Sequence, residues 1–148
     1  MKVEGFLASL EDRTNNYLSS ISDRMFVEID SQRDLKSGGV KEEISYRVHN
    51  PDKDITDYHS YSGGERQRVK IANILAFSDL LGQMDIMILD EVLELSLDED
   101  GKTSVMDLLR EKANNIGTIF VVTHSDVMKE KLDSVIRIRK NDGVSEIY

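Results

Sequence analysis

The sequence predicts an α/β protein whose parallel sheet is flanked by helices. Two short apolar runs, residues 86–89 and 118–123, have the composition of strands that are covered on both faces. Each run follows a helical pattern, at 64–81 and at 99–114, that stops close to a glycine. This helix–strand–helix–strand order favours parallel pairing, and parallel sheets carry their functional groups at the carboxyl ends of the strands.

The first segment of the chain is predicted to be a helix that ends near residues 22–23. Its apolar positions are spaced 4-3-4-3-4, the spacing of a coiled-coil seam. The seam residues are Val3, Leu7, Leu10, Thr14, Tyr17 and Ile21. Thr14 is a poor seam residue, and Phe6 and Leu18 widen the apolar face, so an ordinary amphipathic helix is an equal alternative.

A β-hairpin is expected after this helix. Residues 25–30 are rich in apolar side chains, and residues 37–39 have turn chemistry. Farther on, Ile44, Tyr46 and Val48 alternate with polar residues, as they do in a strand with one covered face. Pro51, the only proline of the chain, closes the hairpin, and a polar loop continues to residue 61.

The remaining elements follow from apolar patterns and glycines. The helix at 64–81 ends at Gly82, and its apolar side consists of Val69, Ile71, Ile74, Leu75 and Leu80. The second helix is stopped by Asn115 and Gly117. After the strand at 118–123 we expect a short helix at 125–132. A terminal hairpin with strands at 134–139 and 144–147 should then turn at residues 141–143.

The bulk properties exclude several classes of protein. With 39% hydrophobic and 32% charged residues, the 148-residue chain resembles a soluble globular domain. It has no cysteine, which excludes disulfides, thiolate chemistry and a cysteine-based zinc site. No apolar run approaches the roughly 20 residues that span a bilayer, and the amino terminus is no signal peptide, so a cytoplasmic location is expected.

The charge balance argues against broad wrapping of nucleic acid by this chain. Its formal net charge is −9, although Arg66, Arg68 and Lys70 cluster at one predicted helix start and residues 137–140 form a second basic group. For both groups, an ordinary solvated surface is the simpler interpretation.

Two adjacent carboxylates, Asp90 and Glu91, directly follow the apolar run 86–89. Burying such charges for packing alone is costly, so a chemical role deserves consideration. Asp90 can hold a hydrated Mg²⁺, and Glu91 can accept a proton from an attacking water. The alternative is that these acids cap the start of a helix.

The segment Ser62-Gly63-Gly64-Glu65 opens the helix at 64–81. Two glycines let the backbone approach a ligand, and the free N–H groups of a helix start favour a phosphate. A plain N-terminal cap, in which Ser62 and Glu65 complete a capping box, explains the same residues equally well.

Two further polar residues follow the strands. His124 comes directly after the run 118–123 and should face the same sheet edge as Asp90, where it can donate to a terminal phosphate or orient a water. A structural histidine is the commoner outcome at such a position. Asp98, in the turn Ser96-Leu97-Asp98, is either part of a site or simply an acidic turn residue.

One motif that phosphate chemistry would require is missing. The chain contains no Gly-x-x-x-x-Gly-Lys-Ser/Thr loop, whose backbone cradles a phosphate chain. A hydrolysis site built from the residues above would therefore need a phosphate-binding loop from another lobe, which indicates that the chain acts in an assembly.

In order and spacing, these elements together resemble the ABC-type ATPases. Residues 62–65 are similar to their signature motif, 86–91 to the Walker B strand with its catalytic glutamate, 96–98 to the D-loop, and 123–124 to the switch histidine. Glu65 stands where transporters usually carry glutamine. The form Ser-Gly-Gly-Glu-Arg-Gln-Arg, with a heptad helix and hairpin before it, resembles the SMC-like repair ATPases.

Within that branch the chain resembles the carboxy-terminal lobe of the ATPase subunit of the Mre–Rad (SbcC-type) nuclease and its phage relatives, the recombination endonuclease subunits. Val92 stands where proline usually follows the Asp-Glu pair, and residues 93–98 also depart from the usual sequence of the repair family. These departures point to a divergent, phage-encoded member. The resemblance divides the chain into the end of a coiled-coil helix, residues 1–24, and a carboxy-terminal ATPase lobe, residues 25–148.

The resemblance implies that two heads sandwich two ATP molecules with Mg²⁺. Asp90 as metal ligand, with Glu91 and His124 as catalytic residues, would act on ATP held by an amino-terminal Walker A lobe. The residues assigned to the ATP of the second head are Ser62, Gly63, Gly64, Glu65 and Asp98. Implied partners are that lobe, the second head, a nuclease subunit and DNA through the assembled complex, with no membrane.

Two other functions remain open for the sequence. One is the same lobe in the nucleotide-binding domain of a transporter, which leaves the heptad helix unexplained. The other is a free-standing lobe without catalysis, which binds another ABC-type ATPase through the signature face and regulates or inhibits it. All three interpretations expect little ATP hydrolysis by the chain alone.

Overall fold

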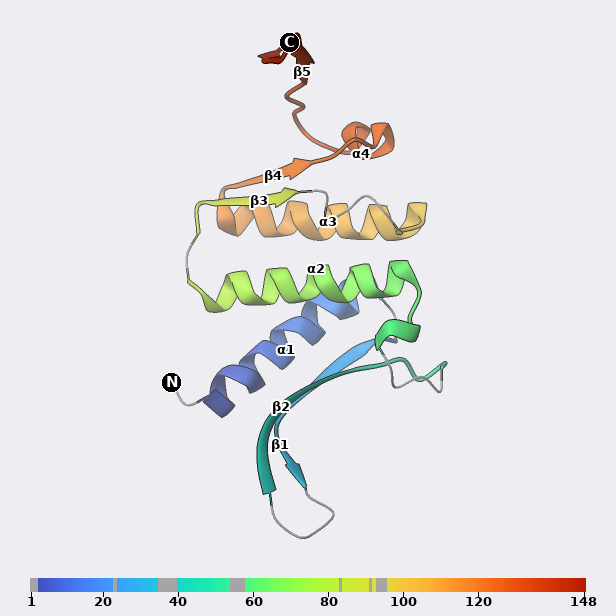
Figure 1. The fold of residues 1–148 in the computed structure, drawn as a ribbon, viewed down its shortest axis with the longest axis vertical. Helices are drawn as coiled ribbons and strands as arrows, with labels where there is room; N and C mark the ends of the chain where they lie inside the picture. Colours follow the sequence, from blue (N-terminus) through green and yellow to red (C-terminus); the bar gives the residue numbers. More distant parts are fainter. Residues whose placement is uncertain are drawn as a thin grey trace.

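Three long helices form the centre of the molecule: α1 (Val3–Ile21), α2 (Gly63–Leu80) and α3 (Glu99–Ile116). The structure is a computed structural model, and it describes residues 3–22, 24–34, 40–53, 58–82, 84–90, 92 and 96–148. Helix α1 contacts both α2 and α3, and α2 lies between α1 and α3 in the view of Figure 1. The main core therefore gathers residues from all three helices.

Helix α1 packs on the other elements over most of its length. Its buried residues are Leu7, Leu10, Thr14, Leu18 and Ile21. Four of these belong to the predicted seam, and the completely buried Leu18 widens the face, so the buried residues fit both a seam and an amphipathic helix. Thr14 is buried because its hydroxyl donates a hydrogen bond of 3.1 Å to Oδ1 of Asn73 on α2. Whether residues 1–24 end a longer coiled coil stays a prediction.

The predicted hairpin is formed by β1 (Phe26–Asp34) and β2 (Val40–His49), which pair antiparallel. Both strands are longer than the apolar pattern indicates, because the backbone pairing continues beyond residue 30, with Gln32 opposite Glu42 and Asp34 opposite Val40. Within the predicted part, Arg47 on β2 forms ion pairs with Glu28 and Asp30 on β1. The expected turn at 37–39 lies outside the described residues. The hairpin extends away from the helices, and the short 3₁₀ helix η1 (Tyr58–Ser60) leads back to α2 (Figure 1).

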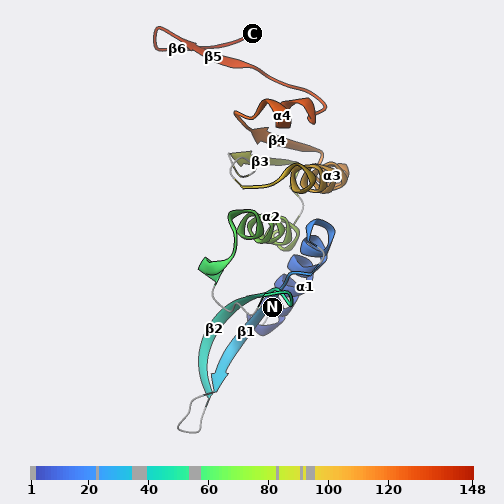
Figure 2. The same cartoon turned by 90° about the vertical axis from the view of Figure 1, so that its right-hand side faces the viewer.

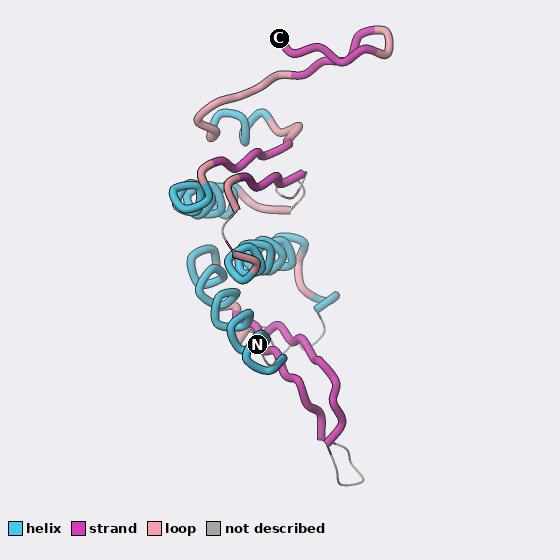
Figure 3. The backbone as a smooth tube through the Cα atoms, turned by 90° about the vertical axis from the view of Figure 1, so that its left-hand side faces the viewer, coloured by secondary structure: helices cyan, strands magenta, loops and turns pink. Residues whose placement is uncertain are grey.

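The central prediction of parallel pairing is confirmed: β3 (Ile86–Asp90) and β4 (Thr118–Val122) form a parallel pair in which Asp90 lies opposite Val122. Only one face of this pair is covered. Met87 and Leu89 are buried toward the helices, whereas Ile86 and Ile88 are 58% and 66% exposed. The expectation that this strand is covered on both faces is thus wrong for the described residues, since buried and exposed side chains alternate along β3. Figure 3 shows α3 beside the strand pair and α2 next below it.

The elements at the carboxyl end follow the predicted order with shifted bounds. Helix α3 runs to Ile116 and not to 114, because it ends only where Gly117 adopts a φ of 97°. Helix α4 (Asp126–Glu130) is followed by β5 (Ile138–Asn141) and β6 (Val144–Ile147). The two strands turn through Asp142 and Gly143, both with positive φ, as a tight hairpin turn requires. Figure 2 shows this last hairpin apart from the helices.

Candidate functional site

The amino-terminal end of α2 holds the predicted signature residues. Ser62 caps the helix: its hydroxyl accepts a hydrogen bond of 3.3 Å from the Glu65 backbone N–H, and the Glu65 carboxylate accepts one of 2.9 Å from the Ser62 N–H. The capping box that the sequence allowed is therefore present. It fixes the Ser62 side chain beside the free N–H groups of the helix start, which leaves the phosphate-binding alternative open.

The Glu65 carboxylate belongs to a second set of contacts besides the cap. Lys53 donates to both of its oxygens at 2.7 Å, and Asn50 donates to Oε1 at 3.0 Å. Burial on its own would raise the pKa of Glu65, but the Lys53 ammonium and the hydrogen bonds from Ser62 outweigh burial and lower the pKa to about 2. Glu65 is therefore ionised at neutral pH and ties the hairpin exit to the start of α2.

Gly63 and Gly64 lie against Ser96, the first residue of the predicted D-loop. A Cβ added at Gly64 would lie 2.7 Å from the Ser96 carbonyl oxygen, and one added at Gly63 would meet the Ser96 side chain. Both positions need glycine because another part of the chain approaches their backbones closely. The structure thus brings the signature residues and the Ser96–Asp98 turn together, which the sequence analysis had treated as separate elements.

Asp98 caps the start of α3 and binds a basic residue of α2. Its Oδ1 accepts a hydrogen bond of 3.0 Å from the Gly101 N–H and one of 2.9 Å from Nη2 of Arg68. The Asp98 side chain is 71% exposed and the Arg68 side chain is 20% exposed. The carboxylate therefore faces solvent on one side while the guanidinium holds it from the other.

Asp90 and His124 lie at the same edge of the sheet, as predicted. Asp90 ends β3 and is paired in register with Val122, the last residue of β4, and His124 follows two residues later. Both residues are exposed. The Ser125 hydroxyl caps α4 directly after His124, so this edge leads into a helix start. Glu91, the predicted proton acceptor, lies outside the described residues.

The arrangement at this edge suits a metal ion that is shared with a substrate. Among the described residues, no group of three or more His, Cys, Asp or Glu side chains could hold a metal on its own. Asp90 is an exposed carboxylate at a strand end, and Mg²⁺ typically takes one or two protein carboxylates together with phosphates and water. Asp90 fits that role, and a nucleotide would have to supply the other ligands.

Two contacts that the sequence does not indicate hold these parts together. The side-chain amide of Gln67 on α2 donates to the carbonyl of Val92, the residue directly after Glu91. Elsewhere, the buried Lys112 ammonium of α3 donates to Tyr17 of α1 and to Asp79 of α2. Gln67 stands in the motif Ser-Gly-Gly-Glu-Arg-Gln-Arg but was assigned no role from the sequence, and nothing local to it indicates its partner 25 residues away.

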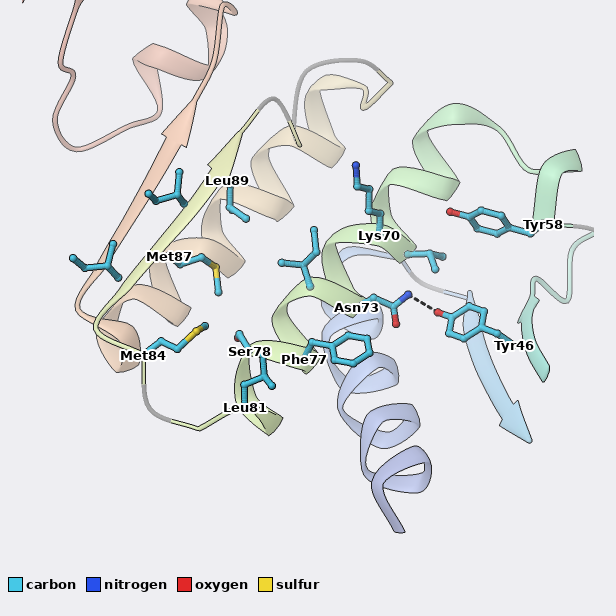
Figure 4. A pocket seen from close by; sticks show the side chains of 14 residues that line it. Tyr46, Tyr58, Lys70, Asn73, Phe77, Ser78, Leu81, Met84, Met87 and Leu89 are labelled. Atoms are coloured by element: carbon cyan, nitrogen blue, oxygen red, sulfur yellow. Dashed lines mark hydrogen bonds between the residues drawn. The ribbon is translucent and has the colours of Figure 1, made fainter. Parts of the chain in front are cut away.

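A groove of about 750 Å³ lies between α2 and β3, and Met87 and Leu89 of β3 point toward α2 (Figure 4). Its lining is mostly apolar and includes Tyr46, Tyr58, Phe77, Leu81, Met84 and Met87. The Asn73 amide donates to the Tyr46 hydroxyl at 2.6 Å across one end of the groove. The lining also includes Ile86 and Ile88, whose side chains are exposed. Within the described residues, no helix is long and apolar enough to cross a membrane.

Comparison with known proteins gives no matching family model but clear relatives. The chain is 36% identical over 87 residues to the DNA double-strand break repair Rad50 ATPase of Pyrococcus abyssi, covering 58% of this chain and 10% of that protein. With the Rad50 ATPase of Methanocaldococcus jannaschii it shares 26% over 145 residues, covering 97% and 14%. With the energy-coupling factor transporter ATP-binding protein EcfA1 of Staphylococcus epidermidis it shares 41% over 83 residues, covering 55% and 29%.

Solved structures show the fold. An SMC ATPase structure, from work on ATP-driven dimerization and DNA-stimulated activation, matches with a TM-score of 0.75 and 22% identity over 98% of this chain and 84% of its own. The Smc head domain of Pyrococcus yayanosii matches with a TM-score of 0.72 and 23% identity over 96% and 26%. The chain thus has the fold of SMC ATPase heads, while it spans less than a third of the length of the Rad50 and EcfA1 relatives.

Proposed function

With the fold of an SMC ATPase head and sequence similarity to Rad50 ATPases as the premise, we propose that this chain is the carboxy-terminal lobe of a DNA-repair ATPase head. The lobe works with an amino-terminal lobe that supplies the phosphate-binding loop. The completed heads bind ATP with Mg²⁺, engage as a dimer and control the access of DNA to an associated nuclease.

The observation that carries this proposal is the uncovered face of the parallel pair β3–β4. Ile86, Ile88, Phe120 and Val122 are between 43% and 66% exposed on that face. Parallel strands are found almost always with both faces covered, because exposed apolar side chains on them are costly. A second lobe that covers this face would complete the sheet and bring its phosphate-binding loop to the edge that carries Asp90 and His124.

The site residues divide by the nucleotide on which they act. Asp90 would hold Mg²⁺, Glu91 would accept a proton from the attacking water, and His124 would contact the terminal phosphate of ATP bound by the same head. The start of α2, with Ser62 and Gly64 fixed by the capping box and by Ser96, would offer its N–H groups to the ATP of the opposite head. Asp98 would couple the residues that act on the two nucleotides.

The proposal is tested on the chain assembled with its amino-terminal lobe. The assembly should hydrolyse ATP in the presence of Mg²⁺, and Glu91→Gln should reduce kcat by at least about a hundredfold while ATP-engaged dimers accumulate. Dimers are measured by size-exclusion chromatography with light scattering. Arg24→Gln, which breaks an exposed ion pair with Asp52, is the control that leaves turnover unchanged. An unchanged kcat for Glu91→Gln would remove this residue from the proton-accepting role.

A transporter lobe is the second candidate, and the 41% identity with EcfA1 favours it. That similarity covers 55% of the chain, whereas the similarity to the Methanocaldococcus jannaschii Rad50 ATPase covers 97% and therefore includes α1 and the β1–β2 hairpin. Affinity purification separates the candidates. Recovery of a membrane-embedded partner supports the transporter, and recovery of a nuclease subunit supports the repair ATPase.

A further inference from the structure

A short turn after β2, residues 50–53, holds two hydrogen-bond donors against the Glu65 carboxylate. The turn is closed by a hydrogen bond of 2.9 Å from the Lys53 N–H to the Asn50 carbonyl, and Oδ1 of Asn50 accepts one of 3.1 Å from the Asp52 N–H. The same Asn50 side chain donates to Glu65 at 3.0 Å, and the Lys53 ammonium donates to both carboxylate oxygens at 2.7 Å. The turn therefore fixes where the Lys53 ammonium lies relative to the start of α2.

The Glu65 carboxylate is a fixed negative charge beside the residues proposed to receive ATP. Its side chain is only 13% exposed, and it accepts a hydrogen bond of 2.9 Å from the Ser62 N–H, so it cannot turn away without breaking the capping box. A carboxylate this close to a triphosphate repels it, and partial burial strengthens the repulsion because little water screens it. Without a cation beside it, Glu65 would oppose the binding of an anion at the start of α2.

Lys53 supplies the positive charge that balances Glu65. The first turns of α2 carry two other basic residues, but Nη1 of Arg66 donates to a backbone carbonyl of η1 at 3.0 Å, and Arg68 pairs with Asp98. The ammonium that pairs with Glu65 thus comes from outside the helix and outside the Ser62–Glu65 motif. Together the two side chains carry no net charge, so the free N–H groups of the helix start can act on an anion.

We propose that Lys53 is a charge-compensating residue, whose ammonium cancels the charge of Glu65 and so lets the start of α2 accept the triphosphate of ATP held by the opposite head. Glu65 keeps its contact with the Ser62 N–H, and Lys53 removes the electrostatic cost of that contact. This inference rests on the proposed function and adds a residue of the hairpin exit on which binding of ATP between the heads depends.

The inference is tested with charge variants of the chain assembled with its amino-terminal lobe. A non-hydrolysable ATP analogue is titrated with Mg²⁺ at about 50 mM salt, and light scattering gives the analogue concentration at half-maximal dimerisation. Lys53→Met leaves the Glu65 charge uncompensated, so this concentration should rise at least about tenfold. The rise should become smaller at about 500 mM salt, because salt screens the repulsion.

Substitution of Glu65 separates the effect of charge from the effect of structure. Glutamine also completes a capping box, so Lys53→Met combined with Glu65→Gln removes both charges and keeps the contact with Ser62. This double variant should return the half-maximal concentration to within about threefold of wild type. Glu65→Gln alone leaves the ammonium uncompensated and should lower the half-maximal concentration at low salt. An ion pair with a purely structural role predicts the opposite, because all three variants lose the pair and all three would weaken dimerisation.

Arg47→Met is the matched control for the loss of one positive charge. Arg47 is 45% exposed on β2 and pairs with two carboxylates of β1. The neighbouring Tyr46 contacts Asn73 of α2, so Arg47 points to the opposite face of the strand. The net charge of the assembly changes as it does in Lys53→Met, but the half-maximal concentration should stay within about twofold of wild type.

Two results would overturn the inference and leave the proposed function standing. One is an equal half-maximal concentration for wild type and Lys53→Met, and the other is a double variant that dimerises as weakly as Lys53→Met. Wild-type assemblies that do not dimerise with the analogue would overturn the proposed function, and this inference with it.

Discussion

The ammonium group of Lys112 is buried beside the carboxylate of Asp79, and the pair joins α3 to α2. Tyr17 of α1 completes the contact: its hydroxyl accepts from Lys112 at 2.9 Å and donates to Asp79 at 2.6 Å. Burial opposes the charge of Lys112, but its bonds to Asp79 and Tyr17 outweigh burial and raise the pKa of the ammonium. The three central helices therefore meet at one charged, hydrogen-bonded cluster.

Removing the Asp79 carboxylate should cost far more free energy of unfolding than removing the Lys112 ammonium. Asp79→Ala leaves Lys112 charged and unpaired inside the protein, and we expect a loss of about 3 kcal/mol in the free energy of unfolding. Lys112→Met removes the cation itself and leaves Asp79 with Tyr17 and with Arg13 at 3.3 Å, so the change should stay within about 1 kcal/mol. Urea unfolding measures both values. Equal losses for the two variants would show that burial of the charge does not govern this cluster.

The close approach of Ser96 to α2 predicts opposite effects for two glycine substitutions. Gly64→Ala places a Cβ 2.7 Å from the Ser96 carbonyl oxygen, a backbone atom, so the turn at residues 96–98 must shift. We expect a net loss of about 1–2 kcal/mol, even after the higher helix propensity of alanine. Gly5→Ala in α1 meets no atom within 4 Å and should stabilise the protein by about 0.5–1 kcal/mol. Thermal unfolding of both variants tests the contact, and a stabilising Gly64→Ala would contradict it.

The contacts of Glu65 predict a specific pH dependence of stability. Its pKa is about 2 in the folded protein against an ordinary value of 4.5, so the folded state binds the proton less well than the unfolded state. Its contribution is fully present above about pH 4.5 and is lost as the pH falls through about 2. The difference in unfolding free energy between wild type and Glu65→Gln should therefore be largest above pH 5 and narrow steadily toward pH 2.

The same dependence should weaken when the partner of Glu65 is removed. Lys53→Met deletes the ammonium that donates to both carboxylate oxygens, so the pH-dependent part should become smaller in this background. Urea midpoints measured at intervals between pH 2 and pH 7 test both variants. A difference between wild type and Glu65→Gln that stays constant over this range would contradict the assignment.

The sequence predicted local structure well where single residues end an element. Ser62 and Gly82 mark the ends of α2, and the order of apolar runs predicted the parallel pair with Asp90 and His124 at one edge. Contacts between distant residues were not predictable in this way. Tyr17 and Lys112 are 95 positions apart, and Gln67 and Val92 are 25 apart. The side chains of Tyr17, Lys112 and Gln67 also suit an exposed helix surface, so no local pattern identifies their partners.

The uncovered sheet face was also beyond local pattern. The continuous apolar run 86–89 predicts a strand with cover on both faces, but the described residues supply cover for only one. An apolar run indicates that both faces of a strand need cover, but it does not indicate which part of an assembly provides that cover. The mismatch between the apolar run and its burial therefore supports the proposal of a second lobe that covers this face.

That proposal predicts how a charge on the open face would act. Ile88 is 66% exposed, so Ile88→Lys should change the unfolding free energy of this chain by no more than about 0.5 kcal/mol. In the assembly the same lysine would lose its hydration without gaining a partner, so affinity for the amino-terminal lobe should fall at least about tenfold. Ile44→Lys is the matched control, because Ile44 is 62% exposed on β2, outside the β3–β4 face. Titration calorimetry with the amino-terminal lobe compares the two, and equal affinities for both variants would show that the lobe binds elsewhere.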